Sequence, residues 1–211
     1  MKILIVDDHA IVRRGLREIL EENGDLEMEF IEAGSSQEAL AALQRRTCDL
    51  MLLDISLPGR NGLELLSQVT RLYPRLPVLI ISMYPEDQYA VRALRLGAAG
   101  YLTKESAPEE LVAAVRKVLS GGRYISSQLA ELLAADLTGG QLNRPLHESL
   151  SDRELQVACM MSRGKTVTEI GRELSLSEKT ISTYRTRILA KLSLRNNAEI
   201  ISYCLRNNLI R

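Results

Sequence analysis

Residues 50–66, LMLLDISLPGRNGLELL, contain the structural unit from which the first half of this chain is built. The segment begins with four apolar residues, passes through a loop with one proline and two glycines, and ends in apolar residues at helical spacing. A short run that is apolar throughout predicts a parallel strand with both faces covered by helices. The segment therefore predicts a β-α unit in which Asp54 directly follows the strand.

The same unit recurs five times in residues 1–122. The predicted strands are 3–6, 29–33, 50–53, 78–81 and 99–101, and the predicted helices are 10–22, 36–46, 62–72, 86–96 and 108–120. Strands that alternate with amphipathic helices in this way indicate an α/β protein. Five units in this length are typical of a flavodoxin-like, doubly wound fold with a five-stranded parallel sheet.

The pattern changes after residue 122. Residues 123–149 read as a linker that is partly helical, because 127–137 could form one helix while 138–140 and 143–145 carry loop signals. From residue 150 to 211 only helical patterns occur, and they predict helices at 152–163, 167–174, 177–192 and 196–207. We therefore expect an α/β domain (1–122), a linker (123–149) and a small all-α domain (150–211).

Charge is divided unevenly between the two predicted domains. Residues 1–122 carry 14 Lys and Arg against 18 Asp and Glu, and residues 150–211 carry 11 against 6. This difference suggests that only the second domain meets a polyanion. No apolar stretch could cross a bilayer, and two aspartates interrupt the apolar start, so we expect a cytoplasmic protein. Three scattered cysteines predict reduced, buried thiols.

Polar residues follow several of the predicted strands. They are Asp7 and Asp8 after the first strand, Asp54 after the third, Ser82 after the fourth and Lys104 after the fifth. In a doubly wound sheet the carboxyl ends of the strands share one edge, so these side chains should converge. Several carboxylates in an oxygen-rich site suit Mg²⁺, and a carboxylate beside such an ion can attack a phosphoryl group to form an acyl phosphate. Lys104 and Ser82 would then share the charge of the transferring group. Taken singly, each residue has a simpler interpretation, such as a helix cap for Asp8.

Residues 151–192 fit a helix-turn-helix, with a support helix, a scaffold helix at 167–174, a turn at 175–177 and a longer last helix. One face of the last helix is apolar and should pack inward: Ile181, Tyr184, Ile188 and Leu192. The opposite face carries basic, hydroxyl and small residues, namely Lys179, Thr183, Thr186 and Ala190, with Ser182 and Arg187 on its flanks. Such a face suits the major groove of DNA, although the pattern alone fits a solvated surface helix equally well.

The first domain resembles the receiver domain of two-component response regulators. The motifs that carry the resemblance are ILIVDDH (3–9), LMLLDISLPGRNGLELL (50–66), VLIISM (78–83) and GAAGYLTKES (97–106). The resemblance implies that Asp54 is the phospho-acceptor and that Asp8, Asp54 and the Ser56 main-chain carbonyl bind Mg²⁺, with Asp7 assisting. It also implies a switch pair, Ser82 and Tyr101, and a lysine, Lys104, that pairs with the phosphoryl oxygens. Many receivers have proline after this lysine, where this chain has Glu105.

Residues 150–200 are similar to the LuxR/NarL-type DNA-binding domain. The resemblance implies that 177–192 is the recognition helix and that the last helix contributes to dimerisation. By position, Ser182, Thr183 and Thr186 would face bases, and the candidates for phosphate contacts are Lys179, Arg185, Arg187 and Lys191. Ser182, Tyr184 and Val167-Thr168 depart from the common pattern of this domain, which leaves the operator sequence open.

The leading hypothesis from sequence is therefore a response regulator without enzymatic turnover. A sensor histidine kinase or a small phosphodonor would phosphorylate Asp54 with Mg²⁺, and the chain would bind promoter DNA as a homodimer, with RNA polymerase a candidate partner and no membrane involved. One alternative is a protein that binds DNA or protein partners without phosphorylation. Another is a Mg²⁺-dependent phosphohydrolase, which typically needs two acids spaced DxD after the first strand. Asp7 and Asp8 are adjacent, so turnover of small phosphate esters should be negligible.

Overall fold

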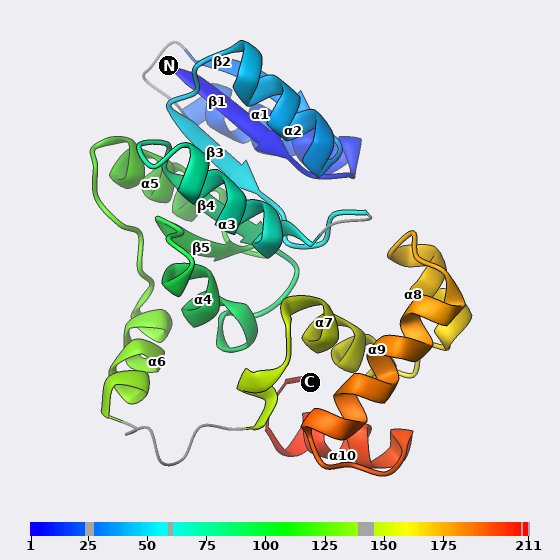
Figure 1. Cartoon of the computed structure of the whole chain (residues 1–211). Helices are drawn as coiled ribbons and strands as arrows, with labels where there is room; N and C mark the ends of the chain where they lie inside the picture. Colours follow the sequence, from blue (N-terminus) through cyan, green and yellow to red (C-terminus); the bar gives the residue numbers. More distant parts are fainter. Residues whose placement is uncertain (24–27, 59–60, 139–145, 208, 211) are drawn as a thin grey trace. The chain divides into compact units, whose positions relative to one another are not determined.

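The structure is a computed structural model that describes the whole chain except residues 24–27, 59–60, 139–145, 208 and 211 (Figure 1). The chain divides into two compact units, residues 1–132 and 133–211. Each unit is described by itself. Within the described residues, no helix is long and apolar enough to cross a membrane.

The first unit contains a five-stranded parallel sheet with the order β2-β1-β3-β4-β5. Its strands are β1 (Lys2–Val6), β2 (Glu29–Ala33), β3 (Leu50–Leu53), β4 (Val78–Ser82) and β5 (Gly100–Thr103). The strand order reverses between β1 and β3, which is the point where doubly wound folds bind ligands at the carboxyl ends of their strands. The predicted doubly wound α/β fold is confirmed.

Helices cover both faces of this sheet (Figure 1). They are α1 (Ala10–Asn23), α2 (Ser36–Arg45), α3 (Gly62–Leu72), α4 (Glu86–Arg95) and α5 (Pro108–Leu119). On one face, Leu20 of α1 and Val115 of α5 belong to the same buried cluster as Ile3, Leu52 and Ile81 of the strands. Alternate strand residues point to the opposite face, where α2, α3 and α4 lie. Covering on both faces explains why the strands are apolar throughout.

The fifth strand is longer than predicted, and this difference has a packing cause. It extends to Thr103, because Leu102 and Thr103 continue the pairing with Ile81 and Ser82. The prediction of 99–101 was therefore wrong at both ends, and Lys104 directly follows the strand. Its first residue, Gly100, forms an isolated bridge with Tyr124, and a Cβ on Gly100 would lie 2.7 Å from the Tyr124 carbonyl oxygen, so a side chain does not fit there.

Helix α6 (Ser127–Thr138) spans the division between the units and confirms the predicted linker helix. The second unit continues with η2 (Leu146–Ser149), α7 (Asp152–Ser162), α8 (Val167–Glu173), α9 (Glu178–Lys191) and α10 (Asn197–Arg206). All four predicted helices of this domain are present within two residues of their expected bounds.

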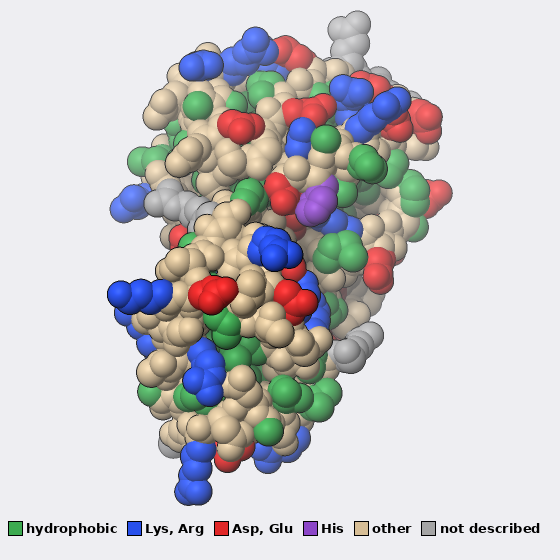
Figure 2. Space-filling view, turned by 90° about the vertical axis from the view of Figure 1, so that its right-hand side faces the viewer, with side chains coloured by type: hydrophobic (Ala, Val, Ile, Leu, Met, Phe, Trp, Pro, Cys, Tyr) green, Lys and Arg blue, Asp and Glu red, His purple; other side chains and the backbone are tan. Residues whose placement is uncertain are grey.

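Figure 2 shows acidic and basic side chains interspersed on one face of the molecule, so no single sign dominates that face.

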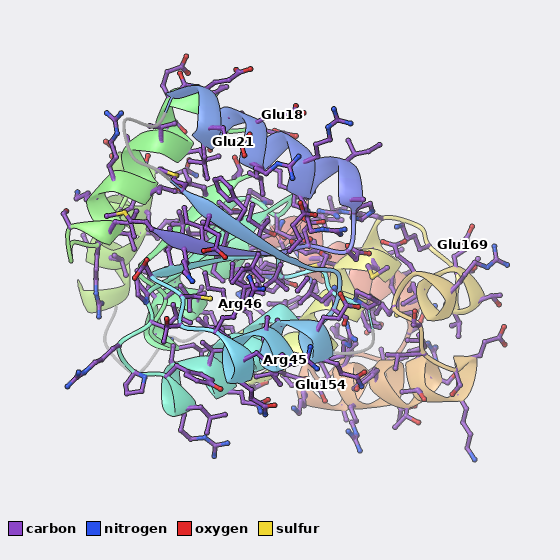
Figure 3. All side chains as sticks on the ribbon, turned by 90° about the horizontal axis from the view of Figure 1, so that it is seen from above. Glu18, Glu21, Arg45, Arg46, Glu154 and Glu169 are labelled. Atoms are coloured by element: carbon purple, nitrogen blue, oxygen red, sulfur yellow. The ribbon has the colours of Figure 1, made fainter. Side chains whose placement is uncertain are left out.

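Side-chain caps explain where the helices of the second unit begin. Ser151 and Thr166 each form a capping box, in which the side chains of Glu154 and Glu169 accept the backbone N–H of the cap residue. Figure 3 labels these two glutamates. Ser177 accepts a hydrogen bond from the Thr180 N–H at the start of α9. Each such cap typically stabilises a helix by about 1 kcal/mol. These contacts place α9 as a separate helix after a tight turn, as a helix-turn-helix requires.

Candidate functional sites

Two buried aspartates and one lysine meet at the carboxyl edge of the sheet. Val6 pairs with Leu53 across β1 and β3, so Asp7 and Asp54 leave neighbouring strands side by side. Both aspartates are buried, with residue exposures of 1% and 2%. The Lys104 ammonium lies 2.5 Å from Asp7 Oδ2 and 2.8 Å from Asp54 Oδ2. Of the five side chains predicted to converge, these contacts bring together Asp7, Asp54 and Lys104.

Burial and charge act in opposite directions in this cluster. Burial raises the pKa of Asp54, the charge of Asp7 raises it further, and Lys104 opposes both without cancelling them. Burial lowers the pKa of Lys104, but the two carboxylates outweigh burial, so that its pKa is raised overall and the ammonium stays charged. One ammonium shared by two buried carboxylates leaves uncompensated negative charge that a further cation would relieve.

The donor atoms around this edge fit a magnesium ion. Asp7, Asp8 and His9 each offer a ligand atom, and these atoms lie within 4.8 Å of one another. Asp54 Oδ1 is buried and has no hydrogen-bond partner among the described residues. The Asp8 side chain is 32% exposed, so water can reach the site, and Mg²⁺ characteristically keeps several waters. His9 was missed as a neighbour of the site, although it directly follows the two aspartates in ILIVDDH.

The loop after β3 is shaped by a close approach between α3 and the Asp54 main chain. A Cβ on Gly62 would lie 2.1 Å from the Asp54 carbonyl oxygen and 2.7 Å from Ile55 Cα. The buried Asn61 caps α3 by accepting a hydrogen bond from the Leu63 N–H at 2.9 Å. Gly62 was not predicted as a site residue, although it lies within the 50–66 motif. Its missing side chain allows α3 to start against the residue that carries the candidate acceptor.

Of the other residues in this loop, Ser56 is half-buried in the segment after Asp54. Its main chain lies close enough to Asp54 to lower the pKa of that carboxyl group. The carbonyl of Ser56 is the atom that the receiver resemblance assigns to Mg²⁺, so the residue lies in the expected neighbourhood.

Ser82 and Tyr101 both bond to the main chain of Tyr84. Both are fully buried. The Ser82 hydroxyl accepts a hydrogen bond from the Tyr84 N–H at 3.2 Å, and the Tyr101 hydroxyl donates to the Tyr84 carbonyl at 2.8 Å. Burial also raises the pKa of Tyr101. Tyr84, which sequence reasoning missed, therefore links the two residues.

The recognition-helix candidate α9 has the two faces that its sequence predicts. Ile181, Ile188 and Leu192 are buried, and Tyr184 is half-buried. The exposed residues of interest are Lys179, Ser182, Thr183, Thr186 and Arg187. The hydroxyls of Thr183 and Thr186 donate to the helix carbonyls of Lys179 and Ser182, at 2.9 and 3.0 Å. This face is open to solvent and carries the side chains that the pattern placed there.

Arg185 and Lys191 differ from the other basic residues of α9 because their side chains bond within the domain. Arg185 Nε donates to Asn197 Oδ1 at 2.6 Å. Lys191 Nζ lies 2.6 Å from Oε2 of the buried Glu154 (labelled in Figure 3) and donates to the Ser149 carbonyl at 3.1 Å. The contacts of these two side chains were not foreseen from the sequence.

A doubly wound sheet that gathers aspartates and a lysine at one edge, joined to a helix-turn-helix, defines a regulator of the receiver class. The family model of the response regulator receiver domain matches residues 3–116, and that of bacterial regulatory proteins of the luxR family matches residues 148–204. The chain therefore belongs to the response regulators that carry a LuxR-type DNA-binding domain.

Several characterised regulators are similar over nearly the whole chain. The chain is 35% identical to the response regulator UvrY of Escherichia coli (strain K12) over 209 residues, covering 99% of this chain and 95% of UvrY. It is 37% identical to the response regulator GacA of Pseudomonas syringae pv. syringae (strain B728a) over 210 residues, covering 100% and 98% of the two chains. Among solved structures, RcsB from Salmonella enterica serovar Typhimurium, bound to promoter rprA with the phosphomimetic BeF3−, has a TM-score of 0.65 and 27% identity. That match covers 96% of this chain and 97% of RcsB.

Proposed function

We propose that this response regulator accepts a phosphoryl group on Asp54 and that the phosphorylated chain binds promoter DNA as a homodimer and regulates transcription. The phosphoryl donor would be a sensor histidine kinase or a small phosphodonor. Phosphorylation and DNA binding would take place in the cytoplasm. We assign phosphorylation to residues 1–122, a connecting role to 123–149 and DNA binding to 150–211. The relation to UvrY, GacA and the promoter-bound RcsB supports this division of labour.

The observation that carries the phosphorylation proposal is the state of the Asp54 carboxylate. One of its oxygens has no hydrogen-bond partner among the described residues, and the other lies 2.8 Å from the Lys104 ammonium. An electron pair on Asp54 would attack phosphorus, and the bond to the donor's leaving group would break with its electrons going to that group. Lys104 would neutralise the phosphoryl oxygens as the bond forms. Bound Mg²⁺, held by Asp8, Asp54 and the Ser56 carbonyl with Asp7 assisting, would supply additional positive charge beside the phosphoryl group.

We propose that Ser82 and Tyr101 report the phosphorylation of Asp54. The Ser82 hydroxyl would turn toward the phosphoryl oxygens. Because Ser82 and Tyr101 both bond to the Tyr84 main chain, any change at Ser82 reaches Tyr84 directly. Tyr101 would hold the same segment from its carbonyl side. The shared contact supports a relay from the acceptor to the start of α4.

We propose that α9 enters the major groove of the promoter. The sequence assigns seven residues of α9 to DNA contacts, and we propose this role for the five whose side chains do not bond to another helix of the domain: Lys179, Ser182, Thr183, Thr186 and Arg187. Exposure supports this role for Lys179, Ser182, Thr183, Thr186 and Arg187. The hydroxyls of Thr183 and Thr186 would reach base edges, whereas Lys179 and Arg187 would neutralise phosphates.

Intact-mass analysis after treatment with acetyl phosphate and Mg²⁺ tests the acceptor. The parent chain should gain one phosphate, and Asp54→Asn should gain none. Asp49→Asn is the matched control, because Asp49 lies directly before β3 and Asp54 directly after it. Full labelling of Asp54→Asn, or loss of labelling in Asp49→Asn, would contradict the assignment. A footprint on genomic DNA with and without phosphorylation tests the output.

A further inference from the structure

We infer that Lys191 and Arg185 position the recognition helix within its domain and do not contact DNA phosphates. The inference rests on the proposal that α9 binds DNA. It divides the four basic residues of α9 that were candidates for phosphate contacts into two classes. Lys191 and Arg185 would bond to neighbouring helices of the domain, and Lys179 and Arg187 would contact DNA phosphates.

Lys191 connects the end of α9 to the beginning of α7. Its ammonium lies 2.6 Å from Glu154 Oε2, and the same oxygen accepts the Ser151 N–H at 2.7 Å in the capping box of α7. A second hydrogen bond from the ammonium reaches the Ser149 carbonyl at 3.1 Å. Glu154 is buried, and its hydrogen bonds with Lys191 and Ser151 outweigh burial and hold its pKa below the usual range. If Lys191 turned away to reach a phosphate, a buried carboxylate would lose its cation, which is strongly unfavourable.

Arg185 makes a second connection, from the middle of α9 to the start of α10. Its Nε donates to Asn197 Oδ1 at 2.6 Å, and Asn197 is the first residue of α10. The Arg185 side chain is half-buried, unlike those of its neighbours Ser182 and Thr186. The recognition helix is thus bonded at two points to the two helices that support it.

Lys179 and Arg187 have the opposite character. Both are exposed, as Lys191 is, but neither side chain has an ion pair or hydrogen bond with any residue that the structure describes. A cation that is free in the domain can approach a phosphate without breaking an internal contact. The salt dependence of DNA binding reports this difference, because each phosphate contact contributes about one unit of slope in a plot of log affinity against log salt.

The test compares Lys191→Gln, Glu154→Gln and the double variant in the phosphorylated full chain. Affinity is titrated across a salt series on a duplex selected from a random-sequence pool with the parent protein and on a scrambled duplex. Glutamine at position 154 can still serve the capping box, so the substitution removes the ion pair and keeps the cap. We expect each variant to weaken binding to the selected duplex severalfold with the slope unchanged, and Lys191→Gln to weaken it most, because only that variant leaves the buried Glu154 carboxylate without its cation. Lys191→Arg should restore binding.

Lys179→Gln is the matched control, since it removes the same charge from the same helix and should lower the slope by about one unit. If Lys191→Gln lowers the slope as Lys179→Gln does while Glu154→Gln binds normally, the positioning role of Lys191 is overturned. If Lys179→Gln leaves the slope unchanged, the placement of α9 on DNA, and with it the proposed function, is overturned instead.

Asn197→Ala separates the two explanations for Arg185 without changing any charge. A positioning role predicts weaker binding to the selected duplex with the slope unchanged. A phosphate contact predicts equal or stronger binding, because the substitution releases the guanidinium. Far-UV circular dichroism of each variant confirms that the domain remains folded. Glu154→Gln and Asn197→Ala leave α9 itself unaltered.

Discussion

Replacement of Gly62 by alanine should disturb the phospho-acceptor loop more than its size suggests. The added Cβ would lie 2.1 Å from the Asp54 carbonyl oxygen, and ordinary contact begins near 3.4 Å. To reach ordinary contact the two groups must separate by 1.3 Å, the difference between these distances. The atoms that must move belong to the main chain, so no side-chain rotation can relieve the contact.

The consequence should appear in both stability and phosphorylation. Overpacking of this kind typically costs about 1–3 kcal/mol, and a displacement of about 1 Å at a reacting group can slow the reaction about a hundredfold. We expect Gly62→Ala to lower the free energy of unfolding by an amount in that range. Its rate of phosphorylation by acetyl phosphate in Mg²⁺ should fall by one to two orders of magnitude, about what such a displacement implies.

Gly15→Ala is the control for this prediction. Gly15 lies in α1, and a Cβ there would meet nothing within 4 Å. Alanine in a helix interior is favoured over glycine by roughly 0.5–1 kcal/mol, so this variant should be more stable than the parent and should be phosphorylated at the same rate. Chemical denaturation measures the stability of both variants. Gly62→Ala with parental stability and a parental phosphorylation rate would refute the steric argument.

Four further predictions concern the relay, the acidic cluster, the linker helix and base recognition. Ser82→Ala should still accept phosphate but gain little DNA affinity from it; a parental gain in a binding titration would exclude the relay. Because burial raises the pKa of Asp54 above 3.8, its contribution to stability is present below that pH and is lost as pH rises through the raised pKa. Asp54→Asn should therefore become more stable relative to the parent as the pH rises through the raised pKa of Asp54, in denaturation experiments with a chelator. A difference in stability that does not change with pH would contradict this. Ser126→Ala removes the hydroxyl that caps α6 and should lower the free energy of unfolding by about 1 kcal/mol, which thermal denaturation measures as a lower melting temperature. The control Ser127→Ala should leave the melting temperature nearly unchanged. Thr183→Ala should lower the binding free energy for the selected duplex by about 1–3 kcal/mol, through particular base pairs, and leave the salt dependence of binding unchanged. Equal weakening on the selected and the scrambled duplex would count against contact with bases.

Periodicity and strand-end chemistry were sufficient to predict the fold class and the acidic cluster. Apolar runs that alternate with amphipathic helices specify a parallel sheet covered on both faces, because no other arrangement buries those runs. Once the sheet is doubly wound, the position of Asp7, Asp54 and Lys104 at strand ends already requires them to meet. The helical pattern of residues 177–192 likewise indicated where α9 lies.

Contacts between residues far apart in the chain could be found only in the tertiary structure. The extra length of β5 depends on its pairing with β4, and the need for Gly62 depends on how closely α3 packs against Asp54. Lys191 had the same pattern of exposure and charge as a phosphate-binding residue, yet its partner Glu154 lies 37 residues earlier in the chain. Periodicity describes which face of an element is apolar. It does not specify which side chains of two packed elements come within hydrogen-bond distance, because that depends on how the elements are packed against each other.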